Sequence, residues 1–186
     1  MKELSQMTLE ELWRLFPIVL TEHDPEWARQ YEREKRRLTK TLKESALIFH
    51  HIGSTAISGI MAKPIVDILL ETPQCADFDG LKERLIDAGY ICMSETDERI
   101  SFNRGYTVHC FADEVFHLHL RRYGDAEEIY FCAYLNEFPR TAKEYEALKL
   151  SLRKTYEHDR DGYTAAKGEF VAAVTKKAKE YYAEKR

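Results

Sequence analysis

The stretch from His51 to Ile68 constrains this chain more than any other, because strand and turn signals alternate closely within it. Apolar residues precede Gly53-Ser54, and an apolar run of strand length follows between Pro64 and Pro73. We expect a strand over 47–52, one or two helical turns over 56–61 and a second strand over 65–70. An apolar run of this kind is typical of a central strand that is buried on both faces.

The glycine-serine turn is a candidate phosphate site. Glycine supplies backbone conformations that other residues resist, and the first N–H groups of a helical turn have no partner within it. We assign Gly53, Ser54, Thr55 and Lys63 as candidate phosphate-binding residues. A tight structural connection is the alternative for such a turn alone. The strand-like flanks and the short spacing to Asp67 favour the phosphate hypothesis.

Asp67 lies inside the second apolar strand, where a lone carboxylate is costly unless it is paired or binds a metal. We predict that it is a catalytic residue and a ligand for Mg²⁺. A carboxylate hydrogen-bonded to a nearby loop is the alternative. A two-metal site would want a second acid at position 69, which is Leu69, and Glu71 lies roughly 13 Å along the strand. We expect Glu71 to be a surface charge at the strand end.

His117 and His119 flank Leu118, so both imidazoles fall on one face of a strand. We assign both as candidate metal ligands and His119 as a candidate catalytic residue. Imidazoles suit Mn²⁺ better than Mg²⁺, so either ion is a candidate cofactor. The alternative is one buried, hydrogen-bonded histidine beside one at the surface.

Two lysines lie on the apolar stripes of C-terminal helices. Tyr145 and Lys149 are four residues apart, and Tyr163 and Lys167 repeat the spacing. Either the lysine stems pack while the ammonium groups reach water, or the two cations face inward toward an anion. Further cations that could join such a basic cavity are Lys63, Arg99, Arg104, Arg121 and Arg122.

The other elements follow from caps and periodicity. A capping box at Thr8 predicts a short helix, 16–20 reads as a strand, and Asp24-Pro25 predicts the start of a helix. Further predictions are helices over 78–88, 127–137, 141–156 and 163–183, strands over 90–94, 99–103 and 115–121, and a loop over 104–114. We therefore expect one domain over 1–186 of the α/β (α+β) class, with an α/β core over about 16–122 and helices over about 127–183 packed on it.

Composition limits the partners. The 186 residues carry a net charge of −4, which gives no electrostatic reason to expect nucleic acid. No apolar run approaches the roughly 20 residues of a membrane helix, and the N-terminus lacks the apolar segment of a signal peptide. The four cysteines form no C-x-x-C pair, so we expect reduced thiols and a cytoplasmic protein. The sequence does not indicate an oligomeric state.

The chain resembles the GrpB family over nearly its whole length. The resemblance rests on motifs at 24–27, 51–56, 62–68 and 117–120, and on Phe131, Tyr134-Leu135, Tyr145, Leu148-Lys149, Tyr163, Lys167 and Phe170. It implies the fold of polymerase-β-type nucleotidyltransferases, a mixed sheet flanked by helices, whose first motif has the spacing from Gly53-Ser54 to Asp67. The chain departs from that superfamily at Leu69, and from GrpB relatives at Cys132-Ala133, where Arg-Asp is common.

Three functional hypotheses follow. The first is an enzyme that binds a nucleoside triphosphate through the turn, the lysines and a divalent ion on Asp67. It would transfer a nucleotidyl group to a hydroxyl of a small molecule or protein. The second is a catalytically inactive module that binds a nucleotide, a CoA-like anion or another phosphorylated small molecule. The third is a metal-dependent hydrolase built on the histidine pair.

Overall fold

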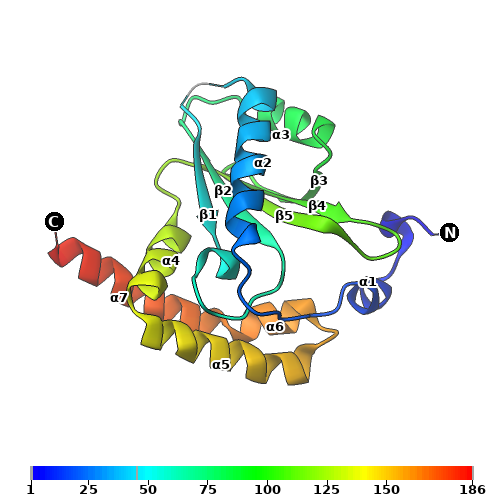
Figure 1. Ribbon diagram of the computed structural model, residues 1–186. Coiled ribbons are helices and arrows are strands. Elements are labelled where there is room, and N and C mark those ends of the chain that lie inside the picture. Colours follow the sequence, from blue (N-terminus) through cyan, green and yellow to red (C-terminus); the bar gives the residue numbers. More distant parts are fainter. Residues whose placement is uncertain (1, 45, 186) are drawn as a thin grey trace.

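A five-stranded mixed sheet organises the protein (Figure 1). The computed structural model describes residues 2–44 and 46–185. Within this part the sheet order is β1-β2-β5-β4-β3; β2 and β5 are parallel and the other neighbours antiparallel. The strands are β1 (Ile48–Ile52), β2 (Val66–Thr72), β3 (Ile91–Glu95), β4 (Arg99–Tyr106) and β5 (Phe111–Arg122). The α/β class expected from the sequence is confirmed.

Helices cover both faces of this sheet. The described α-helices are α1 (Leu9–Leu15), α2 (Glu26–Leu42), α3 (Phe78–Asp87), α4 (Glu127–Glu137), α5 (Pro139–Tyr156), α6 (Arg160–Ala166) and α7 (Gly168–Glu184), with 3₁₀ turns η1 (Leu4–Gln6) and η2 (Ser54–Ala56). Among these, no helix combines the length and the apolar character that crossing a membrane requires.

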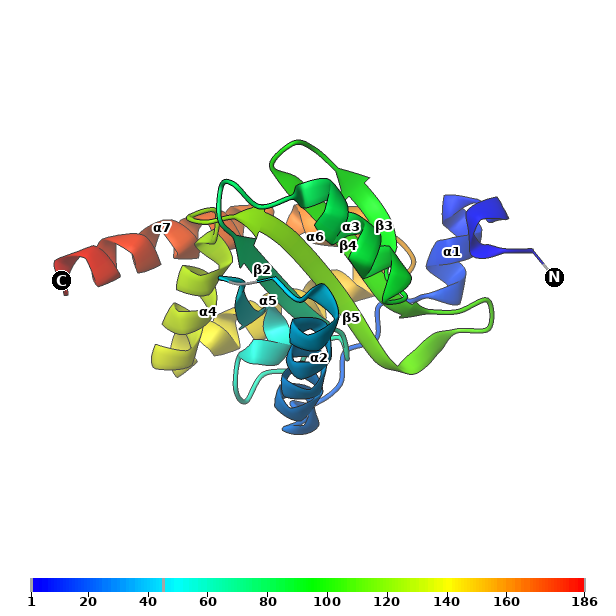
Figure 2. The ribbon, with the colours of Figure 1, turned by 90° about the horizontal axis from the view of Figure 1, so that it is seen from above.

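Two hydrophobic cores flank the sheet because side chains alternate along each strand. Ile68 and Leu118 point to the face covered by α2 and α3, where Trp27 and Leu38 are buried. Leu69 points to the opposite face and packs with residues of α4, α5 and α7. Figure 2 shows α2 and α3 in front of the strands, with α5, α6 and α7 behind them. This second face is the one that carries Asp67 and the two histidines.

Local sequence signals account for several element boundaries. The hydroxyl of Thr8 accepts from the Glu11 amide at 3.2 Å and Glu11 bonds back to the Thr8 amide, so the predicted capping box is present. Asp77 caps α3 as predicted, and α4 spans the predicted 127–137. The Asp24 carboxylate accepts from the Glu26 amide at 2.8 Å, so α2 begins one residue later than predicted.

Four element predictions are wrong. Residues 16–20 form no strand, because Pro17 lacks an N–H and the Ile18 amide donates to the carbonyl of Glu157. The helical turns at 56–61 shrink to η2, and Gly59 follows at φ 72°. The helix over 163–183 breaks between α6 and α7. The loop over 104–114 is shorter, because β4 and β5 extend into it. The buried strand predicted over 65–70 is confirmed: β2 lies between β1 and β5 and is buried along most of its length.

Candidate active site

Asp67 lies directly against the glycine-serine turn. A Cβ placed on Gly53 would come within 2.1 Å of the Asp67 Oδ2 atom, so only glycine allows this contact. Gly53 has φ 73° and ψ −172°, a conformation that glycine adopts without strain. Ser54 and Thr55 then start the single turn η2. The two features that the sequence linked by spacing are therefore in contact.

A chain of hydrogen bonds holds Asp67 from the other side. His117 Nδ1 donates to Asp67 Oδ1 at 3.1 Å, and the phenol of Tyr106 meets His117 Nε2 at 2.8 Å. Arg160, at the start of α6, donates to the Tyr106 oxygen at 2.7 Å. Burial alone would raise the pKa of Asp67, but the bond from His117 and the charges around it hold that pKa below its ordinary value.

Three lysines surround the turn and the carboxylate in a cavity of about 1100 Å³. Lys63 precedes β2, Lys149 comes from α5 and Lys167 ends α6. Lys149 is 1% exposed and donates to the carbonyl of Met61. None of the ion pairs among residues 2–44 and 46–185 includes these three lysines. Lys149 and Lys167 therefore both line the cavity, which corresponds to the inward-facing alternative of the two that the helix spacing allowed.

The electrostatics of the cavity favour a bound anion. Burial lowers the pKa of Lys63 to about 7, and the charges of Arg160 and Lys167 act in the same direction. Burial also lowers the pKa of Lys149 to about 7, with Lys167 adding to it. The pKa of Lys167 is lowered by burial. An anion among them would restore the ordinary pKa values, because an opposite charge favours the protonated form.

Tyr163 supplies a further polar group to this cavity. It is 1% exposed, and its hydroxyl has no hydrogen-bond partner among the residues described. The Lys167 Nζ lies 4.4 Å from the centre of its ring and the Lys63 Nζ 5.7 Å. A buried hydroxyl without a partner is costly, and an oxygen-rich ligand in the cavity would satisfy it.

The histidine pair does not converge on one point as predicted for metal ligands. Both ring nitrogens of His117 already have partners, Asp67 and Tyr106. His119 Nδ1 lies 3.4 Å from the Ser101 hydroxyl, and its Nε2 has no partner in the described part of the chain. Across residues 2–44 and 46–185, no group of three or more histidine, cysteine, aspartate or glutamate side chains is placed to hold a metal ion.

Other charged residues fall outside the cavity. Glu71 is not a surface charge: it is 7% exposed, bonds to His50 at 2.8 Å and accepts from the Gly124 amide. Of the predicted extra cations only Lys63 lines the cavity. Arg104 pairs with Glu34 on the opposite face of the sheet, and the remaining three bind acids or carbonyls near the far ends of β2, β4 and β5: Arg99, Arg121 and Arg122.

Sequence reasoning missed two site residues. Tyr106 falls in the predicted loop, and Arg160 lies in the Asp159-Arg160-Asp161-Gly162 segment that suggests only a turn. That turn is present, with the Asp159 carboxylate accepting from the Gly162 amide at 2.8 Å, but it also aims Arg160 at Tyr106. The sequence would have indicated a contact between Tyr106 and His117 only if the pairing of β4 with β5 had been predicted. The described thiols are free, and that of Cys132 lies 3.6 Å from the Gly53 carbonyl.

Known proteins share this architecture. The family model for GrpB protein matches residues 17–177. The glutamate-rich protein GrpB of Alkalihalophilus pseudofirmus is 36% identical over 166 residues, covering 84% of this chain and 93% of that protein. The crystal structure of conserved protein GrpB from Enterococcus faecalis matches at TM-score 0.76 and 29% identity, over 88% of this chain and 99% of that one.

A second solved structure extends the likeness in fold. The Cid1 poly(U) polymerase matches at TM-score 0.51 and 13% identity, over 80% of this chain and 46% of that one. Identity at this level shows the fold alone. The resemblance drawn from the sequence motifs is thus confirmed, and the chain belongs to the GrpB family, with a fold like that of the nucleotidyltransferase Cid1.

Proposed function

We propose that the protein binds a nucleotide in the cavity and transfers its nucleotidyl group to a hydroxyl of a small molecule or protein. One observation carries the proposal: the Asp67 carboxylate contacts the Gly53 turn within a wall of lysines that form no ion pair with any acid of the described residues, 2–44 and 46–185. An oligophosphate is the ligand that matches several cations, a turn with free N–H groups and one acid. The free thiols fit action in the cytoplasm.

The residues present fit one divalent ion that arrives with the nucleotide. Mg²⁺ is usually held by one or two carboxylates together with substrate phosphates and water. Asp67 would provide the carboxylate, and His119 lies one strand away as a nitrogen ligand that suits Mn²⁺. When bound, Mg²⁺ or Mn²⁺ would neutralise phosphate charge. His117 would act by orienting Asp67, since both of its nitrogens are occupied.

The side chains divide the remaining tasks. Lys63, Lys149 and Lys167 would neutralise the charge on the phosphates, which is the main electrostatic demand of such transfers. The turn at Gly53 and Ser54 would fix the phosphate chain against Asp67. With Mg²⁺ held by Asp67 and not by His119, the His119 ring would be free to accept the proton of an acceptor hydroxyl, because burial lowers its pKa and keeps it neutral near pH 7.

Replacing Asp67 with asparagine tests this proposal. We expect Asp67→Asn to weaken Mg²⁺-dependent ATP binding by at least tenfold and to abolish transfer of labelled α-phosphate, because the amide cannot neutralise the ion. Binding is measured by calorimetry and transfer by the label. Asp87→Asn is the matched control, because Asp87 is exposed on α3 and does not line the cavity. Unchanged metal-dependent binding in Asp67→Asn would contradict the proposal.

A binding module without catalysis is the second candidate. Leu69 favours it: the side chain is fully buried among apolar residues, at the position where a second metal-binding acid would stand. Such a module would hold a nucleotide or CoA-like anion through the same cations. Binding without any movement of labelled α-phosphate, in Mg²⁺ or Mn²⁺, would select this function over transfer.

A further inference from the structure

The cavity has an apolar half that phosphate binding does not use. Its wall on one side is the N-terminal helix α1, with Leu12 and Trp13. On the other side is the edge strand β3, where Ile91 is 47% and Met93 58% exposed. The volume of about 1100 Å³ slightly exceeds the usual range for small-molecule sites, so the cavity has room for more than a phosphate chain.

Four residues that lie side by side on neighbouring strands change from charged to apolar across the sheet. Asp67 on β2 pairs with His117 on β5, His117 with Asn103 on β4, and Asn103 with Ile91 on β3. Neighbouring strands are about 4.8 Å apart, so Asn103 lies about 10 Å from Asp67 and Ile91 about 14 Å. A ligand lying along this row meets an anion-binding end first and an uncharged end last.

Asn103 is the polar group at the boundary between the two halves. Its side chain lines the cavity and makes no hydrogen bond with the described residues. A side-chain amide offers two donors and one acceptor in a plane, which suits the edge of a heterocycle. The beginning of the apolar half is therefore able to bind a flat group that has both donors and acceptors.

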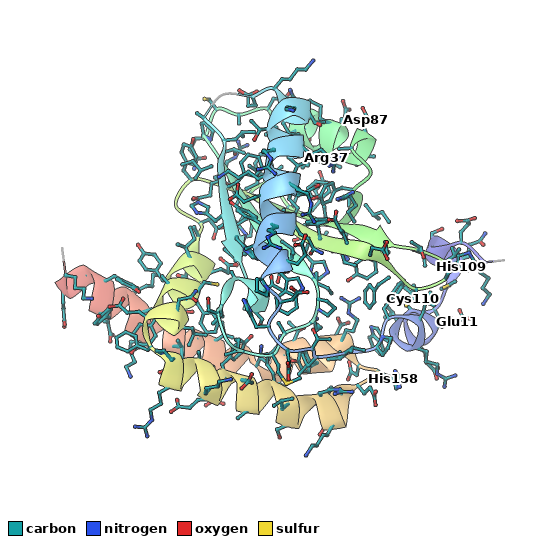
Figure 3. All side chains as sticks on the ribbon, viewed as in Figure 1. Glu11, Arg37, Asp87, His109, Cys110 and His158 are labelled. Atoms are coloured by element: carbon teal, nitrogen blue, oxygen red, sulfur yellow. The ribbon has the colours of Figure 1, made fainter. Side chains whose placement is uncertain are left out.

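The α1 wall lies outside the part of the chain that the family model matches, which begins at residue 17. This helix contains no buried residue, yet it contributes the apolar side chains of the cavity wall. Figure 3 shows Glu11 of α1 on the same side of the molecule as His109 and Cys110, at the tip of the β4–β5 hairpin. Substitutions in α1 should therefore change the cavity and leave the core intact.

We propose that α1, β3 and Asn103 form a subsite for the base of the nucleotide whose phosphates bind the three lysines. This inference rests on the proposed function and names the part of the ligand that the apolar half takes. The absence of cations from the α1 and β3 lining selects an uncharged group, and the row from Asp67 to Ile91 places it beyond the phosphates. Trp13 supplies the aromatic surface that bases commonly contact.

The test compares ATP with tripolyphosphate, which carries the phosphates without a base. Trp13→Ala is expected to raise the ATP Kd by about tenfold, the scale of a lost base–aromatic contact, and to leave the tripolyphosphate Kd unchanged. Asn103→Ala is expected to raise the ATP Kd by about threefold to tenfold. Arg14→Ala is the matched control, because Arg14 is exposed on α1 and does not line the cavity.

Fluorescence gives an independent signal, since the second tryptophan, Trp27, is buried in the core on the opposite face of the sheet. ATP should change the emission of the wild-type protein and not that of Trp13→Phe. An unchanged ATP Kd in Trp13→Ala, or an equal loss for tripolyphosphate, overturns the base subsite. Trp13-dependent ATP binding with no tripolyphosphate binding would overturn the phosphate site and leave the base subsite standing.

Discussion

Gly53 is the residue on which the geometry of the site depends. Its backbone conformation is one that side chains resist, and the space beside it is already filled by the Asp67 carboxylate. The turn and the acid are therefore placed by a single steric contact. The pairing of β1 with β2 explains why the spacing in the sequence could link the turn to the acid. The two strands are antiparallel and Ile52 lies opposite Asp67, so Asp67 comes next to Gly53, the residue that follows Ile52.

Substituting Gly53 and Gly59 distinguishes the effect of backbone strain from the effect of displacing Asp67. Gly53→Ala should lower the free energy of unfolding by about 1–3 kcal/mol and weaken Mg²⁺–ATP binding by more than tenfold, because the new methyl displaces Asp67. Gly59→Ala is the matched control: Gly59 has nearly the same φ, 72°, with nothing within 4 Å of its Cβ position. Urea unfolding and calorimetry measure both. Equal losses of binding in the two variants would contradict this account.

At the scale of elements, three separate segments build the hydrogen-bond chain behind Asp67. Tyr106 ends β4, His117 lies in β5 and Arg160 begins α6. The carboxylate can only accept, so His117 carries its proton on Nδ1 and receives the Tyr106 hydroxyl at Nε2. The pairing of strands thus decides the tautomer of a side chain.

Removing the phenol hydroxyl tests this chain. In the wild-type protein, long-range ¹H–¹⁵N spectra should show His117 as the Nδ1–H tautomer. Tyr106→Phe should keep the Nδ1–H tautomer, because the Asp67 carboxylate still accepts from Nδ1, and should lower the free energy of unfolding by about 1 kcal/mol, because Arg160 and His117 both lose a partner. Phe111→Tyr is a control for added bulk nearby, since Phe111 packs on Tyr106. A mixture of the two tautomers in Tyr106→Phe would contradict this account, because it would show that Asp67 alone does not hold the proton on Nδ1.

Elements were predictable where local signals decide them, and not where tertiary contacts do. Caps at Thr8 and Asp77 fix α1 and α3 from the sequence. The break between α6 and α7 has only Gly168 as a local signal, and the periodicity of 163–183 passes through it. Lys149 keeps its spacing to Tyr145 within α5, and Lys167, at the junction of α6 and α7, still lines the cavity together with Tyr163.

At the scale of the whole molecule, the lysines of the cavity link stability to pH. Lys149 has a pKa of about 7 in the folded protein and 10.5 as its ordinary value. Between these values the unfolded chain binds more protons than the folded one, so the free energy of unfolding rises as pH increases from about 7 to about 10.5. Below about pH 7 this contribution is constant, and Lys63 behaves in the same way.

Lys149→Met should therefore stabilise the ligand-free protein. We expect a free energy of unfolding that is higher by a few kcal/mol at pH 7 and a shallower rise between pH 7 and pH 9, because the buried charge is gone. Urea unfolding at pH 7, 8 and 9 measures both. Lys154→Met, at an exposed position of the same helix, controls for helix propensity. A steeper rise in Lys149→Met would contradict the sign argued above.

The overall fold class and the sheet face that carries the site follow from the sequence, but the burial and the partners of charged residues outside the site do not. Strand alternation places Asp67 and both histidines on one face, as predicted. Glu71 is misplaced because only the fold brings His50 and the Gly124 amide to it. Arg104 is misplaced for the same reason, since its partner Glu34 comes from a distant helix.

The lysine wall has a consequence for which anions can approach. Counted at full charge, the three lysines, Arg160 and Asp67 carry +3, which leaves −7 on the rest of the chain. Charges more than a Debye length of about 8 Å apart are largely screened, so an anion is attracted by the lysines only when it lies in or close to the cavity. If the proposed phosphate site is correct, a compact phosphate can lie wholly within reach of these lysines, whereas a long polyanion would also lie near the remainder of the chain, whose net charge is negative.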